Sequence, residues 1–474
     1  MEKRKSSKGL IWSFFDSFLQ QLVNFSIGII LARLLSPKEF GVVGIIAVFI
    51  ALSNVIVNAG FSEAIINRKK VSEEEYSSVF WLNLMISGVV YFILFITAPL
   101  VESFFEIVNL SELIRVTGLS VIFMSLSIIQ RTMLTRDLDF KRIAIISFIS
   151  VILSGGVAIY MAFNGYGIYS LVIRMTLGQF LTMIFFYSFN RWKPLLLIKW
   201  SFINSIFDYS YKLFLSKLLN AIYNNVYYVI IGKVFSTDIL GYYTRAENFK
   251  NVASINIANT INRVSFPVLS KIEVKEELRR KFILYFTITS LLSGYAMNIL
   301  FINADNIILI LVGEEWNISI NYLRVLSISG LFIPIYMQNL SIQSVIGNAT
   351  EYLRIEFYNK LLIIPGVFLA IYLGIDFLLQ YIVSMSVVLY LFSVYKLRKV
   401  FNNLLQEQMK LLFPIGCMSF ILIIMTSFIS DFIDNEYFEL LCQVAIISIS
   451  FLFLIKYFYK NLNILNLEKI WRKK

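Results

Sequence analysis

Long runs of apolar residues, each close to the length of a bilayer crossing, dominate the chain. A transmembrane helix needs ~20 predominantly apolar residues. We expect about 14 transmembrane helices, and the windows that predict them lie at 10–34, 40–61, 79–101, 111–130, 143–163, 167–189, 204–232, 239–262, 283–303, 320–342, 357–374, 376–396, 411–430 and 437–459. The windows at 204–232 and 239–262 are the most polar, and such spans usually line a cavity or pack within a bundle. The pattern predicts an all-α polytopic membrane protein.

Composition supports this fold class. Of the 474 residues, 58% are hydrophobic and 15% are charged. Soluble domains are roughly 45–50% apolar and about 25% charged. A soluble protein this apolar would expose large apolar patches to water, whereas a lipid bilayer accommodates them.

The basic residues indicate how the chain is oriented. The net charge is +12, and Lys and Arg gather in alternate connections between the apolar windows. The intervening connections carry only Lys38 and Lys233. Because cytoplasmic loops are enriched in Lys and Arg, this asymmetry predicts an even number of spans with both termini in the cytoplasm. The positive charge is thus explained as the orientation signal of a membrane protein, and we expect no nucleic-acid partner.

Several kinds of chemistry have no support in the sequence. The chain has no histidine, so His-based acid–base catalysis and His-ligated metal sites are excluded. Its two cysteines, Cys417 and Cys442, lie in apolar runs and indicate no disulfide framework. The sequence contains no GxxxxGK[ST] motif for nucleotide phosphates. We therefore expect no catalytic residues, no metal and no cofactor.

Two hairpin segments separated by 200 residues resemble each other. LARLLSPKEFGVVG at 31–44 aligns with IGKVFSTDILGYYT at 231–244, matching Arg33 with Lys233 and Gly41 with Gly241. Two similar hairpins could arise by chance, but a parallel repeat is the better explanation. The repeat predicts two pseudo-symmetric six-helix lobes, at 1–200 and 201–400, related by an axis along the membrane normal. Residues 401–474 would add two further helices and a basic tail.

The same segments carry a family resemblance. ARLLSPKEFG…GFSEAIINRKK, followed by FWLN, and the second block IIGKVFSTDILGYYTRAENF resemble the Wzx-type polysaccharide flippases of the multidrug/oligosaccharidyl-lipid/polysaccharide exporter superfamily. The resemblance implies a two-lobed bundle that works by alternating access in a bacterial inner membrane. It also implies a polyprenyl-diphosphate-linked oligosaccharide as substrate, such as the O-antigen repeat unit of lipopolysaccharide or the repeat unit of a capsule. Other polysaccharide assembly proteins are expected partners. Many relatives carry an acidic residue in the middle of the seventh span, where this chain has Tyr227.

A diphosphate needs compensating cations when it leaves the headgroup layer. We therefore expect basic and amide side chains within or at the ends of spans to bind the substrate. These candidates are Arg33, Arg174, Lys212, Lys217, Asn224, Asn225, Arg245 and Lys250.

Acidic residues within spans are candidates for binding a coupling proton or sodium ion. Asp16 and Asp208 are these candidates. Asp16 has no basic residue three or four positions away. Glu247 has Lys250 at helical spacing, which favours an internal ion pair instead.

The sequence thus predicts a transporter that flips a lipid-linked oligosaccharide for polysaccharide export. One alternative is an ion-coupled drug or cation antiporter of the same superfamily, for which a carboxylate-dominated cavity is expected. A second is a membrane polymerase or ligase of lipid-linked sugars, for which a large outer domain or acidic outer loop is expected.

Overall fold

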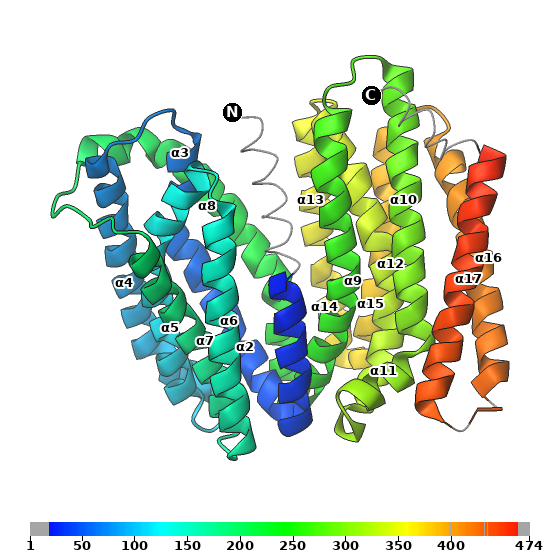
Figure 1. The fold of residues 1–474 in the computed structure, drawn as a ribbon, viewed down its shortest axis with the longest axis horizontal. Coiled ribbons are helices and arrows are strands. Elements are labelled where there is room, and N and C mark those ends of the chain that lie inside the picture. Colours follow the sequence, from blue (N-terminus) through cyan, green and yellow to red (C-terminus); the bar gives the residue numbers. More distant parts are fainter. Residues whose placement is uncertain (1–18, 399, 431, 434, 463–474) are drawn as a thin grey trace. The chain divides into compact units, whose positions relative to one another are not determined.

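A computed structural model describes residues 19–398, 400–430, 432–433 and 435–462. Within these ranges the chain is helical, with no β-strand. Figure 1 shows long helices running side by side in each part of the molecule. The all-α polytopic fold class is confirmed.

The chain divides into two compact units, Met1–Gly241 and Tyr242–Lys474. The first unit contains a helix at Leu19–Leu34. Its other elements are α2 (Pro37–Asn58), α3 (Phe61–Asn67), α4 (Glu73–Phe105), α5 (Leu110–Arg136), α6 (Phe140–Phe163), α7 (Ile168–Phe189), α8 (Trp200–Ile230), the π-helix η1 (Ile231–Phe235) and the first residues of α9 (Thr237–Leu269).

The second unit contains the rest of α9 and the remaining helices. These are α10 (Lys275–Ile302), α11 (Ala304–Leu311), the 3₁₀ turn η2 (Glu314–Trp316), α12 (Ile318–Val345), α13 (Ala349–Leu361), α14 (Ile363–Leu373), α15 (Ile375–Leu397), α16 (Leu404–Ser430) and α17 (Glu436–Leu462).

Eleven of the described helices are long and apolar enough to cross a membrane. The helix at Leu19–Leu34, together with α8 and α9, occupies three further predicted windows without being counted among these eleven. Both α8 and α9 fall in the windows that the sequence marks as most polar. A total of 14 spans stays a prediction.

α8 packs against α2 and α3, so it belongs to the first unit. The repeat assigns the same helix, by its place in sequence, to a second lobe beginning at residue 201. The division into two units follows packing contacts, whereas the division into lobes follows the predicted sequence repeat. The lobes at 1–200 and 201–400 and the appended segment at 401–474 stay predictions.

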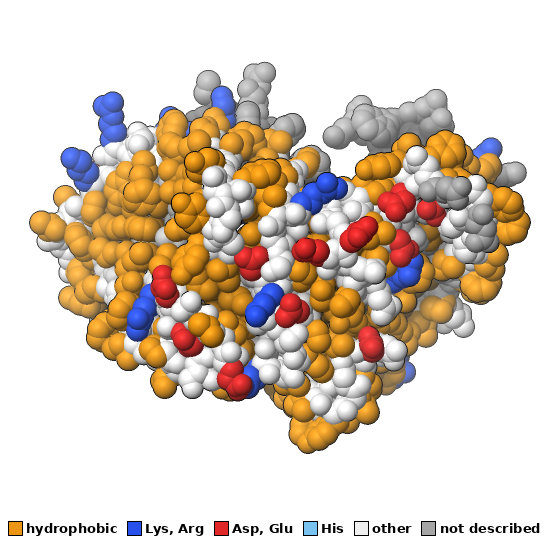
Figure 2. Space-filling model, turned by 90° about the horizontal axis from the view of Figure 1, so that it is seen from below, with side chains coloured by type: hydrophobic (Ala, Val, Ile, Leu, Met, Phe, Trp, Pro, Cys, Tyr) orange, Lys and Arg blue, Asp and Glu red, His pale blue; other side chains and the backbone are white. Residues whose placement is uncertain are grey.

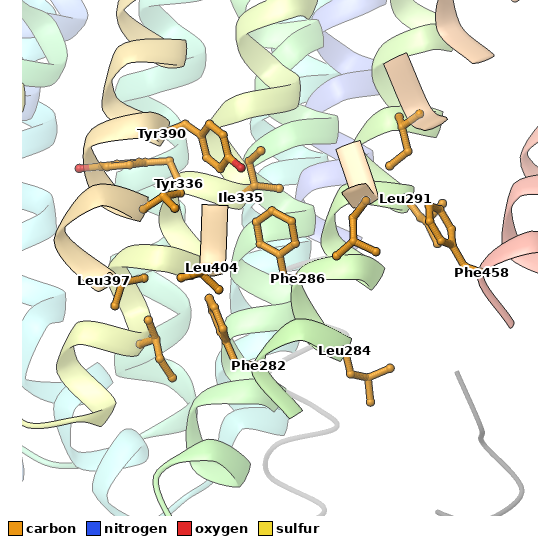
Figure 3. Close-up of a cluster of buried hydrophobic side chains, with 14 of the residues drawn as sticks. Phe282, Leu284, Phe286, Leu291, Ile335, Tyr336, Tyr390, Leu397, Leu404 and Phe458 are labelled. Atoms are coloured by element: carbon orange, nitrogen blue, oxygen red, sulfur yellow. The ribbon is translucent and has the colours of Figure 1, made fainter. Parts of the chain in front are cut away.

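Close packing of large apolar side chains holds the second unit together. Phe282, Phe286 and Leu404 are almost fully buried in one cluster (Figure 3). Phe282 also stacks on Phe401, with ring centroids 5.9 Å apart. These contacts join α10 to the start of α16, and truncation of a buried phenylalanine typically costs ~3–5 kcal/mol.

The surface differs from that of a soluble protein. Large apolar side chains are exposed along α4, α16 and α17, including Leu100, Phe420 and Leu452. Figure 2 shows a mostly hydrophobic surface on which acidic and basic side chains are interspersed. Exposed apolar helix faces of this extent are suited to lipid.

Candidate functional site

The first unit contains an open cavity of about 440 Å³, which we call the arginine cavity. Its walls come from the helix at Leu19–Leu34 and from α2, α5, α6 and α7. The lining residues are Gln20, Asn24, Phe40, Val43, Arg131, Ser147, Val151, Ser154, Leu171, Arg174, Met175, Gly178, Gln179 and Thr182. Among these described residues, two are cationic and none is a carboxylate. The lining is otherwise a mixture of amides, hydroxyls and apolar groups.

Arg174 reaches this cavity from one face of α7. Its Nη2 donates a hydrogen bond to Asn24 Oδ1 over 2.8 Å. Leu171, Met175 and Gly178 line the same cavity, and residues three or four apart share a helix face. A Cβ on Gly178 would lie 3.4 Å from Ser154 Oγ, so these small residues allow α6 and α7 to approach closely. The structure thus places the predicted Arg174 in an open cavity with a second cationic residue, Arg131.

Arg131 is a second cavity arginine that the sequence analysis missed. The predicted span ended at residue 130, which assigned Arg131 to a connection, whereas α5 continues to Arg136. Thr132 and Leu134 are both buried, because this last part of the helix still packs against its neighbours. Burial of residues that follow Arg131 shows that the helix continues beyond its apolar window.

Two guanidinium groups without an acidic neighbour in the lining suit a phosphorylated ligand. Arginine presents a planar fork of donors that binds phosphate oxygens in a bidentate manner. Asn24, Gln20 and Gln179 add amide groups that can contact phosphate or sugar oxygens.

The predicted charges on α8 lie elsewhere. Lys212 Nζ donates to Asp208 Oδ2 over 2.7 Å, and both side chains are exposed. Lys217 pairs with Glu63 of α3. Lys212, Asp208 and Lys217 each have a carboxylate or ammonium partner within the first unit and do not line the arginine cavity.

The two asparagines of α8 that were predicted to bind substrate, Asn224 and Asn225, also lie outside the arginine cavity. Asn225 Nδ2 donates to the Ala221 carbonyl oxygen over 2.7 Å, within the same helix. Asn224 is exposed. Arg33 is likewise exposed, near the end of the helix at Leu19–Leu34. Asp16 lies outside the described residues.

Two predicted cations of α9 are buried in the second unit. The guanidinium of Arg245 lies over the ring of the buried Trp316, with its Cζ 5.0 Å from the ring centroid. Lys250 Nζ lies 4.0 Å from Glu247 Oε1, which is the pairing that their spacing indicates. Buried charges are tolerated where they are paired in this way. Substrate binding by any of the predicted residues, and ion coupling by Asp16 or Asp208, stay predictions.

Comparison with solved structures identifies the fold. The fold resembles that of the lipid II flippase MurJ in an inward closed conformation, with a TM-score of 0.77 and 17% identity over 96% of this chain and 99% of that one. A multidrug resistance MATE family transporter of the MOP superfamily, in an inward-facing conformation, gives a TM-score of 0.64 with 16% identity, covering 81% of this chain and 96% of the transporter. This chain shares the fold of these two proteins.

The family follows from the sequence. Residues 30–321 match the family described as Polysaccharide biosynthesis protein, and the chain belongs to this family. An uncharacterized membrane protein in the cps region of Klebsiella pneumoniae is 26% identical over 338 residues, which cover 69% of this chain and 68% of the relative. The teichuronic acid biosynthesis protein TuaB of Bacillus subtilis (strain 168) is 24% identical, over 63% of this chain and 62% of its own length. The lipopolysaccharide biosynthesis protein WzxC of Escherichia coli (strain K12) is 24% identical, over 64% and 62%.

Proposed function

We propose that this protein carries a polyprenyl-diphosphate-linked oligosaccharide from the inner to the outer leaflet of a bacterial cytoplasmic membrane, by alternating access, for polysaccharide export. Its family membership and its MOP superfamily fold support transport of such a substrate. Named relatives point the same way, since one is a succinoglycan biosynthesis transport protein of Rhizobium meliloti (strain 1021).

The arginine cavity is the observation that carries the proposal. A diphosphate has at least two negative charges, and moving them through hydrocarbon without cations is prohibitive. Arg131 and Arg174 provide two guanidinium groups in one open cavity among transmembrane helices. A cavity that transported cationic drugs would need acidic side chains instead, and the described lining has none.

We further propose that the chain is a transporter and not an enzyme, with both termini in the cytoplasm. The clustering of Lys and Arg in alternate connections supports this orientation. Lys212, Lys217, Arg245, Lys250, Arg33, Asn224 and Asn225 are secondary candidates for substrate contact during transport, and Asp16 and Asp208 for ion coupling. Membrane lipids and other polysaccharide assembly proteins are the proposed partners.

Complementation tests this function. In a bacterium lacking its own exporter, but making the matching sugar unit, the wild-type chain should restore surface polysaccharide. Arg131→Ala combined with Arg174→Ala should abolish export at normal membrane expression, whereas Lys70→Ala, at an exposed lysine of the connection before α4, should export normally. Full export by the double variant would refute the role of the arginine cavity.

A further inference from the structure

The arginine cavity is elongated along α7. Its lining on this helix begins at Leu171 and ends at Thr182, which are about three turns, or ~16 Å, apart along the helix axis. Arg174 lies near the start of this stretch, whereas Arg131 reaches the cavity from α5. The relative depth of the two arginines therefore depends on how α5 and α7 are aligned.

α5 and α7 pack side by side (Figure 1). The rings of Phe123 and Phe180 have centroids 5.1 Å apart. Nearer the ends of both helices, Asn190 Nδ2 donates to Met133 Sδ over 3.8 Å. Both contacts join residues 57 positions apart, so the two helices run in the same direction and keep one alignment over this length.

This alignment places the two cavity arginines at different depths. Arg131 is level with Ser188, which lies about four turns, or ~21 Å, beyond Arg174 on α7. Side chains lean toward the N-terminus of their own helix. Because the two helices are parallel, both arginines lean the same way, and this lean does not bring them together. A diphosphate, whose two phosphorus atoms share one bridging oxygen, is therefore expected to contact one arginine at a time.

The distribution of basic residues indicates which arginine lies nearer the cytoplasm. Arg136, Lys141 and Arg142 lie where α5 is connected to α6, close in sequence to Arg131. At the other end of α6, the connection 164–167 to α7 has no charged residue. Cytoplasmic connections are enriched in Lys and Arg. The predicted orientation thus puts Arg131 toward the cytoplasm and Arg174 farther from it.

The two arginines also differ in exposure. Arg131 is exposed, whereas Arg174 is half-buried and donates from Nη2 to Asn24 Oδ1 over 2.8 Å. Water and ions screen an exposed charge more than a partly buried one. At an interface, removal of an exposed charge mainly alters the rate of association, whereas removal of a buried charge mainly alters dissociation. Arg131 is therefore suited to capture an anion and Arg174 to retain it.

We propose that the arginine cavity binds the lipid-linked diphosphate at two successive positions, first at Arg131 and then at Arg174. This inference rests on the proposed function and assigns an order to the two cations of the same site. Arg131 contacts the diphosphate on its way into the cavity, and Arg174 contacts it in the final bound state.

The lining between the two positions is neutral. Among the described lining residues, no further cation accompanies Arg131 and Arg174. Gln179 lies on the cavity face of α7 between the two depths, and its carboxamide can donate to phosphate oxygens. The hydroxyl of Thr182 donates to the Gly178 carbonyl oxygen over 2.7 Å, within its own helix. A neutral stretch of this kind keeps the two binding positions distinct.

Binding kinetics test this order on the purified full-length protein. The probe is a short-chain fluorescent polyprenyl diphosphate, and association and dissociation rates are measured by stopped flow together with equilibrium affinity. Arg131→Ala should slow association and dissociation equally, by about fivefold. It should change the affinity by less than about twofold, because Arg131 does not contact the diphosphate in the final bound state. Arg174→Ala should weaken the affinity at least about tenfold through faster dissociation.

Two further variants serve as controls. Arg131→Lys keeps the positive charge and should keep both rates within about twofold of the wild type. Lys70→Ala removes an exposed charge that does not line the cavity, so it should leave rates and affinity unchanged.

Three results would overturn the two-step order while leaving the proposed function intact. These are an affinity loss for Arg131→Ala as large as that for Arg174→Ala, unchanged rates for Arg131→Ala, and equal slowing by Lys70→Ala or Arg131→Lys. The first would show that both arginines hold one diphosphate together. Failure of the wild type to bind the probe would overturn both the order and the proposed function.

Discussion

Gly41 and Gly241 hold equivalent places in the two repeat segments and face each other where α2 meets the start of α9. A Cβ on Gly41 would lie 1.7 Å from the carbonyl oxygen of Thr237, and a Cβ on Gly241 would lie 1.9 Å from the carbonyl oxygen of Pro37. The contact is reciprocal, because each glycine meets the residue four positions before the other. Thr237 and Pro37 are themselves separated by 200 residues, which is the offset of the predicted repeat.

Alanine at Gly41 should therefore push the two helix starts apart. A methyl group 1.7 Å from a carbonyl oxygen cannot be accommodated without backbone movement. Overpacking typically costs ~1–3 kcal/mol, so Gly41→Ala should lower the midpoint of thermal unfolding in detergent. Gly156→Ala is the matched control, since a Cβ on this helical glycine of α6 meets nothing within 4 Å. An unchanged midpoint for Gly41→Ala would show that the helix starts separate without cost.

Replacement of Gln408 by leucine should destabilise the second unit. The fully buried Gln408 accepts a hydrogen bond from Tyr390 Oη over 3.0 Å and donates to Asn339 Oδ1 over 2.8 Å. Leaving buried polar partners unsatisfied costs ~1–3 kcal/mol. The midpoint of thermal unfolding should be lower for Gln408→Leu than for the wild type. Gln406→Leu, at an exposed position two residues earlier, should change the midpoint little. Equal midpoints for the two variants would argue against a stabilising role for the network.

The pair between Glu106 and Lys233 should respond to acid. A hydrogen bond and the positive charge of Lys233 lower the pKa of Glu106 from its ordinary value of 4.5. The folded carboxyl is thus more acidic than the unfolded one, so its stabilising contribution is present above pH ~4.5 and is lost as the pH falls through the lowered pKa. The effect is small because the pair is solvent-exposed.

Thermal unfolding at a series of pH values measures this contribution. The midpoint for wild type should fall in acid slightly more than that for Glu106→Gln, and the two curves should converge at the lowest pH. Parallel curves over the whole range would contradict the attraction between the two side chains.

The geometry of Arg174 predicts a graded series of variants. Lysine keeps the charge but loses the planar fork of donors, and it cannot bind phosphate in the bidentate manner of arginine. Arg174→Lys should therefore retain part of the affinity for a polyprenyl diphosphate, and Arg174→Ala should lose at least about tenfold. Equal affinities for lysine and alanine variants would show that charge at this position does not contribute.

Much of the fold could be predicted because apolar length and turn residues are local properties. The predicted windows 143–163 and 167–189 lie close to α6 (Phe140–Phe163) and α7 (Ile168–Phe189). The low hydropathy of α8 and α9 was also visible in sequence, although it left the total number of spans open. Apolar windows mark the lipid-facing part of a helix, however, and miss polar ends that continue inside the bundle, which is why Arg131 was assigned to a connection.

The candidate site could be predicted only in part. Arg174 was identifiable as a cation inside a span, because such residues are costly in lipid. The pairing of Lys217 with Glu63 was not predictable, since these residues are 154 positions apart and meet only through the packing of α3 on α8. Which cations share a cavity likewise depends on tertiary packing between helices.

Transport in reconstituted vesicles tests the central claim most directly. The purified chain is inserted into liposomes with a polyprenyl-diphosphate-linked oligosaccharide, and the fraction of substrate accessible on each leaflet is measured over time. We predict that the wild type exchanges the substrate between leaflets and that the double variant Arg131→Ala, Arg174→Ala does not. Exchange by the double variant at the wild-type rate would contradict transport through the arginine cavity.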